Sequence, residues 1–284
     1  MLVGMPLNKP AAVLRALVPL SLLISAHPMA ASELSVFDNI YKTNKWGGTN
    51  ISNAGAGSGG GSSLQGSIGA SRIIYHVCVE RNLNSIVDAP CGGMEWQESL
   101  AFQLRRILPH FRYLGLDAAA SVIERNQQHF QANSHVAFCN ADLTSLTLSL
   151  PTQYDGLLFS RDSMMHNTLD GCWKMLNFFT RTHVKYVLLG SYGKNHPGRK
   201  NGARSTGRWF AIALDEPPFN LKPLRKYPEG DGENKFMLLY EREQLRAELI
   251  KRGKARDGWV QNSTGSSRRP RSCAYLSNGR TPIP

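Results

Sequence analysis

The sequence lacks the cysteine and histidine spacings of a metal site. It has five cysteines in 284 residues, with no Cys-x-x-Cys pair and no histidine at ligand spacing. A structural zinc site is therefore not expected. An odd number of cysteines also argues against a complete disulfide framework. Cys78 and Cys139 lie in apolar runs, which predicts that they are small core residues.

Acidic residues are absent from positions 1–32, and no apolar run there is long enough to cross a bilayer. Lys9 and Arg15 precede an apolar stretch at 16–26, which is well short of the roughly 20 residues that a spanning helix needs. Small residues follow at 30–32. This order predicts a signal or targeting peptide over 1–32 and a place in the secretory pathway, in the ER or Golgi lumen or outside the cell. An organellar transit peptide and a cytoplasmic location remain the alternatives.

The net charge of +12 is concentrated at one end of the chain. Residues 251–284 contain eight basic residues and one acid, so they contribute +7 and leave +5 for the rest. With its Ser, Gly and Pro content, this segment is predicted to be a disordered basic tail. Such a tail could make weak contacts with membranes or polyanions, and no specific nucleic-acid partner is expected.

The stretch from Ser85 to Glu98 combines a strand, a small-residue turn and the start of a helix. Ile86 and Val87 predict a buried strand that ends on Asp88. The turn at 89–93 lacks the G-x-G-x-x-G of dinucleotide-binding proteins, which disfavours a pyrophosphate ligand. A smaller adenosyl ligand is compatible, because free N–H groups at a helix start bind acceptor oxygens. A tight turn within any βαβ unit is equally compatible with this spacing.

Helix and strand patterns alternate between residues 68 and 190. Helices are expected at 68–81, 95–108, 121–130 and 169–179, and strands at 85–88, 112–117, 135–139, 154–160 and 183–190. A closing strand at 235–240 and a helix at 241–252 follow an irregular stretch at 191–234. This alternation requires a parallel sheet with right-handed crossovers, and therefore predicts an α/β fold.

Acidic residues end three successive predicted strands. Asp88 and Asp117 are the last residues of their strands, and Asp142 follows the third. Ligands of such sheets bind beyond the carboxyl ends of the strands. Asp117 is placed to accept hydrogen bonds from the ribose hydroxyls of an adenosyl group, and Asp142 to meet its adenine. Helix capping explains any one of these acids, but three together favour a ligand site.

Residues 33–67 precede this pattern and form a distinct segment. The Gly/Ser-rich run at 55–63 has the composition of a flexible linker. Phe37, Tyr41 and Trp46 would bury well against a domain, which favours a lid instead.

With these motifs in place, the chain resembles class I S-adenosylmethionine-dependent methyltransferases, within them a subfamily whose first motif reads D-A-P-C-G-D-x-x-W. Across residues 37–240 the matching positions are Asp88-Ala89-Pro90-Cys91-Gly92 and Trp96, Tyr41, Asn44 and Trp46-Gly47, Ser58-Gly59-x-Gly61-Ser62, Arg161-Asp162 with His166 as R-D-x-x-x-H, 185–188, Gly207-x-Trp209, and 218–221. Gly93 stands where the subfamily usually has Asp, and Phe210 where it usually has Arg.

The resemblance implies a Rossmann-like, seven-stranded, mostly parallel sheet with helices on both faces, here a methyltransferase domain at 68–250. It also implies S-adenosyl-L-methionine as cofactor, with the Gly/Ser run as an ordered loop whose amides at 59–62 bind the cofactor's carboxylate. The cofactor-binding residues it implies are Trp46, Gly59, Ser62, Asp88, Ala89, Pro90, Cys91, Gly92, Asp117, Asp142, Leu143 and Arg161.

Methyl transfer from a sulfonium needs a positioned nucleophile and, for a hydroxyl or amine, a base. His166 is the candidate base, because histidine titrates near neutral pH. Asp162 lies four residues earlier, so one helical turn could let it orient His166. Arg161 is either an anchor for an acidic substrate or a structural partner of Asp162. A helix-capping or core role is the alternative for His166.

We therefore expect an enzyme that methylates an oxygen or nitrogen of a small molecule or sugar. Because Gly93 and Phe210 depart from the subfamily's motifs, a catalytically impaired, methyltransferase-like binding protein remains an alternative. Because of the basic tail, a nucleic-acid methyltransferase is a further alternative.

Overall fold

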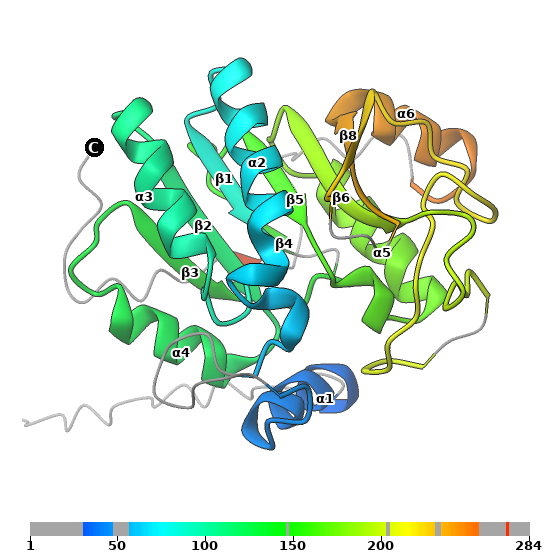
Figure 1. The fold of residues 1–284 in the computed structure, drawn as a ribbon, viewed down its shortest axis with the longest axis horizontal. Coiled ribbons are helices and arrows are strands. Elements are labelled where there is room, and N and C mark those ends of the chain that lie inside the picture. Colours follow the sequence, from blue (N-terminus) through cyan, green and yellow to red (C-terminus); the bar gives the residue numbers. More distant parts are fainter. Residues whose placement is uncertain are drawn as a thin grey trace, which may run out of the picture. The chain divides into compact units, whose positions relative to one another are not determined.

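A seven-stranded sheet lies at the centre of the fold, in the order β3-β2-β1-β5-β6-β8-β7 (Figure 1). Its strands are β1 (Ser85–Asp88), β2 (Arg112–Asp117), β3 (Val136–Asn140), β5 (Leu157–Ser160), β6 (Tyr186–Tyr192), β7 (Arg225–Pro228) and β8 (Lys235–Glu241). The five neighbouring strands β3, β2, β1, β5 and β6 pair in parallel. Strand β8 is antiparallel to both β6 and β7. The predicted fold class is confirmed.

This computed structural model describes residues 31–47, 57–145, 148–202, 205–230, 234–255 and 271–272. The predicted targeting peptide up to residue 30, residues 48–56 and most of the predicted basic tail lie outside these ranges. From Ser32 onward the described residues group into one compact unit. Within the described ranges, no helix has the length and apolarity needed to cross a membrane.

Side chains alternate across the sheet, so helices can cover both of its faces. Ile86 packs in the cluster formed with α2 (Ile68–Glu80), α3 (Gln97–Ile107) and α4 (Ala120–His129). Its neighbour Val87 packs in the opposite cluster, with α5 (Leu169–Thr180) and α6 (Arg242–Lys251). Because both faces are covered, the central strands read as continuous apolar runs.

Four elements go beyond the sequence expectations. Helix α1 (Ala31–Lys42) forms within the segment expected only to be aromatic-rich. Strand β7 lies in the stretch expected to be irregular, and only Tyr227 of its four residues is buried, so it shows no apolar run. The short strands β4 (Leu148–Ser149) and β9 (Arg271–Ser272) form a separate parallel pair.

The cysteines fall into two states. Cys78, Cys91 and Cys172 are buried free thiols. Cys139 on β3 is a buried core residue, as predicted, but it is also disulfide-bonded, which the sequence did not indicate. The only other cysteine of the sequence is Cys273, which lies outside the described residues.

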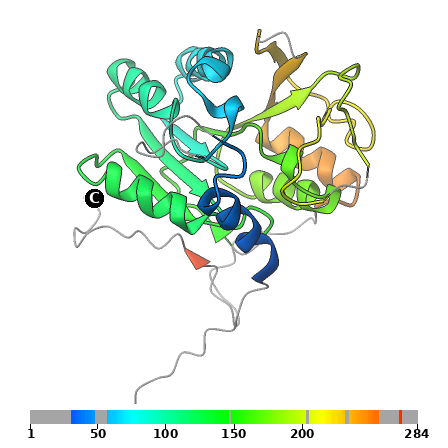
Figure 2. The ribbon, with the colours of Figure 1, turned by 60° about the horizontal axis from the view of Figure 1, so that its bottom comes forward.

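The strand order places a crevice between β1 and β5, where successive crossovers leave in opposite directions. Ligands of open α/β sheets bind at this switch point, beyond the carboxyl ends of the strands. Helix α1 lies at that edge of the sheet (Figure 2). Three single-turn helices also lie in the connections around it, namely η1 (Gly60–Ser62), η2 (Gln65–Ser67) and η3 (Met164–His166).

Gly69 on α2 provides a test of this packing. A Cβ added at Gly69 would lie 1.8 Å from the Glu229 carbonyl oxygen, which is backbone and cannot move aside cheaply. We expect Gly69→Ala to lower the free energy of unfolding by about 1–3 kcal/mol, despite the better helix propensity of alanine. Urea unfolding measures this. Gly202→Ala is the control, because its Cβ would meet nothing within 4 Å. A Gly69→Ala variant as stable as the control would contradict the packing.

Candidate functional site

A cavity of about 830 Å³ opens at the carboxyl edge of the sheet. It is lined by the ends of β1, β2 and β5, the loop after β3, η1, α1 and residues 207–210. The lining includes these residues predicted from the sequence: Trp46, Gly59, Ser62, Asp88, Pro90, Cys91, Gly92, Asp117, Asp142, Leu143, Arg161, Asp162 and His166. The structure therefore brings together residues that are far apart in the chain.

Ala89 is the exception among the predicted cofactor-binding residues. It is fully buried in the core, and its N–H donates to the Phe159 carbonyl at 3.0 Å, across the β1–β5 junction. Ala89 therefore supports the turn from beneath and does not line the cavity.

The glycine turn joins three parts of the site. Gly92 has a φ of +54°, and its N–H donates to Asp117 Oδ2 at 3.0 Å. The Gly93 N–H donates to Ser58 Oγ at 3.0 Å. A Cβ at Gly92 would lie 2.8 Å from the same oxygen, so both the conformation and the close approach of the loop require glycine.

Two side chains hold Asp88 beneath the glycine turn. Its Oδ2 accepts hydrogen bonds from Gln97 Nε2, at 3.0 Å, and from the Tyr113 hydroxyl. Burial raises the pKa of Asp88 well above its usual value, and this outweighs the two hydrogen bonds, which lower it. Its Oδ1 is buried and has no hydrogen-bond partner among the described residues.

Asp117 and Asp142 are both fixed by backbone amides. Asp117 Oδ1 accepts from the Ala119 N–H at 2.9 Å. Burial raises the pKa of Asp117 to about 6, although nearby amides oppose this shift. Asp142 Oδ1 accepts from the Thr144 N–H and hydroxyl at 2.8 and 2.7 Å. Asp142 therefore caps its own turn, as the capping interpretation expects, and also lines the cavity.

Helix α1 is attached to the start of α4. Asp38 Oδ1 accepts from the Ser121 N–H and hydroxyl, at 3.1 and 2.7 Å. This attachment holds the N-terminal segment across the carboxyl edge of the sheet, where Figure 2 shows it.

The aromatic residues of this segment meet over the cavity. The Trp46 ring lies 6.2 Å from the Phe37 ring and 5.9 Å from the Tyr41 ring, between centroids. It also covers the His166 imidazole, with centroids 4.5 Å apart and planes inclined at 31°. Tyr41 in turn hydrogen-bonds Ser58 at 3.2 Å. Because Phe37, Tyr41 and Trp46 all line the cavity, the segment forms part of its wall.

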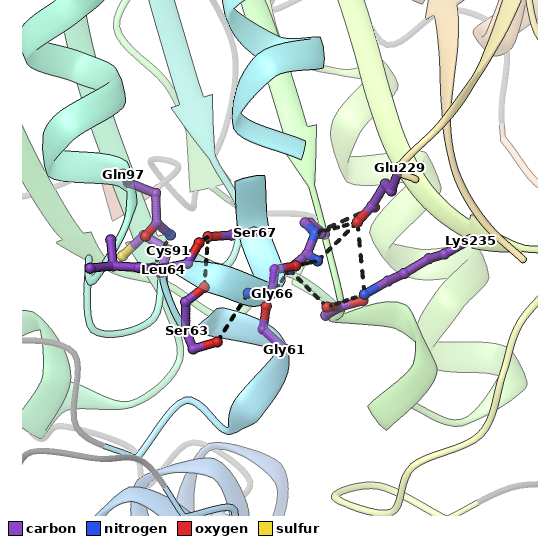
Figure 3. A network of polar contacts seen from close by, with 11 residues as sticks. Gly61, Ser63, Leu64, Gly66, Ser67, Cys91, Gln97, Glu229 and Lys235 are labelled. Atoms are coloured by element: carbon purple, nitrogen blue, oxygen red, sulfur yellow. Dashed lines mark hydrogen bonds and ion pairs between the residues drawn. The ribbon is translucent and has the colours of Figure 1, made fainter. Parts of the chain in front are cut away.

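The Arg161 guanidinium is saturated by protein groups, of which Figure 3 labels Glu229, Gly61 and Gly66. It donates to the Glu229 carboxylate at 2.9–3.3 Å, to the Gly61 carbonyl at 2.7 Å and to the Gly66 carbonyl at 2.8 Å. It also lies 3.0 Å from Asp162 Oδ2. These contacts favour the structural role over the anchor for an acidic substrate, and they tie the Gly/Ser loop to β5.

Asp162 shares its Oδ2 between two cations. Besides Arg161, Lys235 Nζ lies 2.8 Å from it and 3.9 Å from Glu229 Oε2. Burial pushes the pKa of Asp162 upward, but Arg161 and Lys235 outweigh it and hold this pKa below its usual value. The sequence interpretation missed Lys235 and Glu229. The signal for Lys235 was a charged residue at the start of an otherwise apolar strand.

His166 has a defined tautomer. Its Nδ1 lies 3.3 Å from the Arg208 carbonyl, which can only accept, so Nδ1 carries the hydrogen and Nε2 is left as an acceptor. Burial lowers the pKa of His166, and the charge of Asp162 only partly opposes this. The expectation that Asp162 orients His166 over one helical turn was wrong. Asp162 has a φ of +52° and pairs with Arg161 and Lys235, while η3 begins at Met164.

The loop amides at 59–62 are not equivalent. The Gly59 N–H donates to the Gly47 carbonyl, and the Ser62 N–H donates to the Gly59 carbonyl, both at 3.1 Å. These two amides are therefore already used within the protein. Gly60 and Gly61 remain as donors toward a ligand, and a Cβ at Gly60 would project into open space.

No protein-family model and no curated protein matches this chain. Among solved structures, human N-acetylserotonin methyltransferase in complex with SAM is 14% identical, with a TM-score of 0.47, covering 75% of this chain and 60% of that one. Magnesium protoporphyrin IX methyltransferase from Synechocystis PCC 6803 with bound SAM is 13% identical, with a TM-score of 0.46 and coverages of 72% and 92%. The mitomycin 7-O-methyltransferase MmcR is 12% identical, with a TM-score of 0.45 and coverages of 62% and 54%. With TM-scores below 0.5, these similarities carry no information on what this chain binds or acts on.

Arg161→Lys tests the attachment of the loop. Lysine keeps the charge but cannot reach Glu229 and both loop carbonyls together. We expect amide hydrogen exchange at Ser62 and Ser63 to accelerate about tenfold, which corresponds to roughly 1.4 kcal/mol. Arg81→Lys is the matched control, because Arg81 also uses its guanidinium, on Tyr186, but away from the cavity. Equal exchange in both variants would show that Arg161 does not hold the loop.

Proposed function

We propose that this chain is a class I methyltransferase that uses S-adenosyl-L-methionine to methylate an oxygen or nitrogen of a small molecule or sugar. One observation carries the proposal: a single cavity at the sheet's switch point contains acidic side chains from three strand ends together with a neutral histidine. The former suit an adenosyl ligand, and the latter suits removal of a proton from an acceptor.

The residues present fit the proposed cofactor. Asp88 has an unpaired, buried carboxyl oxygen at the end of β1, where the methionine part would lie. Each carboxyl oxygen of Asp117 accepts one amide and keeps a lone pair for a ribose hydroxyl. Asp142 and Leu143 line the next part of the cavity, which suits the adenine. When bound, S-adenosylmethionine would supply a methyl group on a sulfonium for in-line displacement.

His166 would act as the base. Its Nδ1–H is held by the Arg208 carbonyl, which directs Nε2 away as the proton acceptor. The lowered pKa keeps the imidazole neutral near pH 7, in the form that can take a proton. Trp46 covers one face of the ring, which fixes its orientation and excludes water from that side. The acceptor would therefore approach Nε2 in the plane of the ring, on the edge away from the Arg208 carbonyl.

A catalytically impaired binding protein is the second candidate, because Gly93 and Phe210 depart from the subfamily's motifs. The contacts of both residues favour activity. The Gly93 N–H is bonded to Ser58, so the turn is closed without an Asp side chain. Lys200 Nζ lies 5.3 Å from the centroid of the Phe210 ring, so a cation stands close to the position where Arg is usual.

Cofactor titration with a His166 variant separates the two candidates. We expect wild-type protein to bind S-adenosylmethionine in calorimetry and to transfer labelled methyl groups to a component of a fractionated extract. His166→Ala should keep cofactor affinity within about twofold and lower turnover by roughly 10²–10⁴-fold. Cofactor binding without any transfer by the wild type would support the impaired protein. Full activity of His166→Ala would reject its role as base.

The affinity for an adenosyl ligand should depend on the charge of Asp117. Its pKa of about 6 in the free protein means that it is protonated below that pH and loses acceptor capacity toward ribose. The affinity for S-adenosylhomocysteine should therefore be highest above pH 6 and fall by up to tenfold per pH unit below it. Asp117→Asn cannot titrate, so it should bind more weakly above pH 6 and lose this pH dependence. If the variant shows the same pH profile as the wild type, Asp117 is not the cause of the pH dependence.

A further inference from the structure

Asp162 has a carboxyl oxygen that the protein does not use. Its Oδ2 is shared by Arg161 and Lys235, while its Oδ1 is buried and has no hydrogen-bond partner among the described residues. The carboxylate lines the cavity, with 17% of its side chain exposed, and its pKa is held below the usual value. A buried, ionised oxygen without a partner is costly, which points to a donor supplied from outside the chain.

The Gly/Ser loop lies directly against this carboxylate. A Cβ added at Gly61 would lie 3.0 Å from Asp162 Oδ2. The loop can therefore approach the carboxylate this closely only because residue 61 has no side chain. The amides of Gly60 and Gly61 remain as donors in the same loop. A donor pair that suits an anion therefore stands beside a carboxylate that suits a cation.

The charges around Asp162 balance. Arg161 and Lys235 provide two cations, and Asp162 and Glu229 provide two carboxylates, all joined by contacts of 2.8–3.9 Å (Figure 3). A bare anion or cation would upset this balance. A zwitterion, with one charge of each sign, would preserve it and could use both the loop amides and Asp162.

We propose that Asp162 binds the α-ammonium group of S-adenosylmethionine, beside the loop amides that the family resemblance assigns to its α-carboxylate. This assignment rests on the proposed function and gives Asp162 a role in cofactor recognition in place of orienting His166. Asp88 is the other carboxylate of the cavity with an unpaired oxygen, but it is fully buried and burial favours its neutral form, so it suits an ammonium less well.

Two ligands that differ only at the amino-acid end test the proposal. S-adenosylhomocysteine carries the ammonium and carboxylate, and 5′-methylthioadenosine lacks both. Calorimetry with the full chain should show tighter binding of the first. Asp162→Asn keeps the size of the side chain but loses its charge. We expect it to weaken S-adenosylhomocysteine at least tenfold and to change 5′-methylthioadenosine by less than about twofold.

Glu229→Gln is the matched control. Glu229 contacts the same two cations, Arg161 and Lys235, but does not line the cavity. Disturbing the ion pairs through Glu229 loosens the loop but leaves the charge of Asp162 in place, so the ratio of the two affinities should fall less than in Asp162→Asn. A thermal melt of each variant checks that it is folded.

The outcomes separate the proposals. An unchanged ratio of the two affinities in Asp162→Asn would overturn the ammonium assignment and leave Asp162 Oδ1 to a water molecule. The same loss of ratio in Glu229→Gln would also overturn it, because the effect would then come from the ion pairs. Wild-type protein that binds neither nucleoside would instead overturn the proposed function itself.

Discussion

The buried ion pair between Arg161 and Glu229 is the interaction on which the site depends. It joins the end of β5 to the turn between β7 and β8, and the same guanidinium holds the loop carbonyls of Gly61 and Gly66. Breaking a buried pair from one side leaves an uncompensated charge and typically costs about 3–5 kcal/mol. The cavity wall formed by the loop therefore depends on a contact between segments 68 residues apart.

Hydrophobic packing positions the rest of the site. The apolar faces of β1 and its neighbours fix the sheet, and the sheet brings the carboxyl ends of the strands to one edge. The N-terminal segment lies over that edge, where its contacts include Asp38 on Ser121, Tyr41 on Ser58 and Trp46 on His166.

The sheet and most of the cavity lining could be predicted because they follow local patterns. Apolar runs gave the strands with bounds close to those observed, and acids at strand ends were placed by topology alone. Strand β7 could not be found this way, because it is an edge strand with one buried side chain. Glu229 and Lys235 were missed because their importance arises from long-range pairing. The tautomer of His166 depends on a carbonyl 42 residues away, which no local pattern shows.

Cys139 places a redox-sensitive bond close to the candidate site. It lies on the edge strand β3, three residues before Asp142, and it is disulfide-bonded. Disulfides persist in oxidising compartments and are reduced in the cytosol. The disulfide on the strand that leads into the proposed adenine end of the cavity therefore depends on the redox potential of its surroundings. An oxidising compartment is the environment in which this bond is retained.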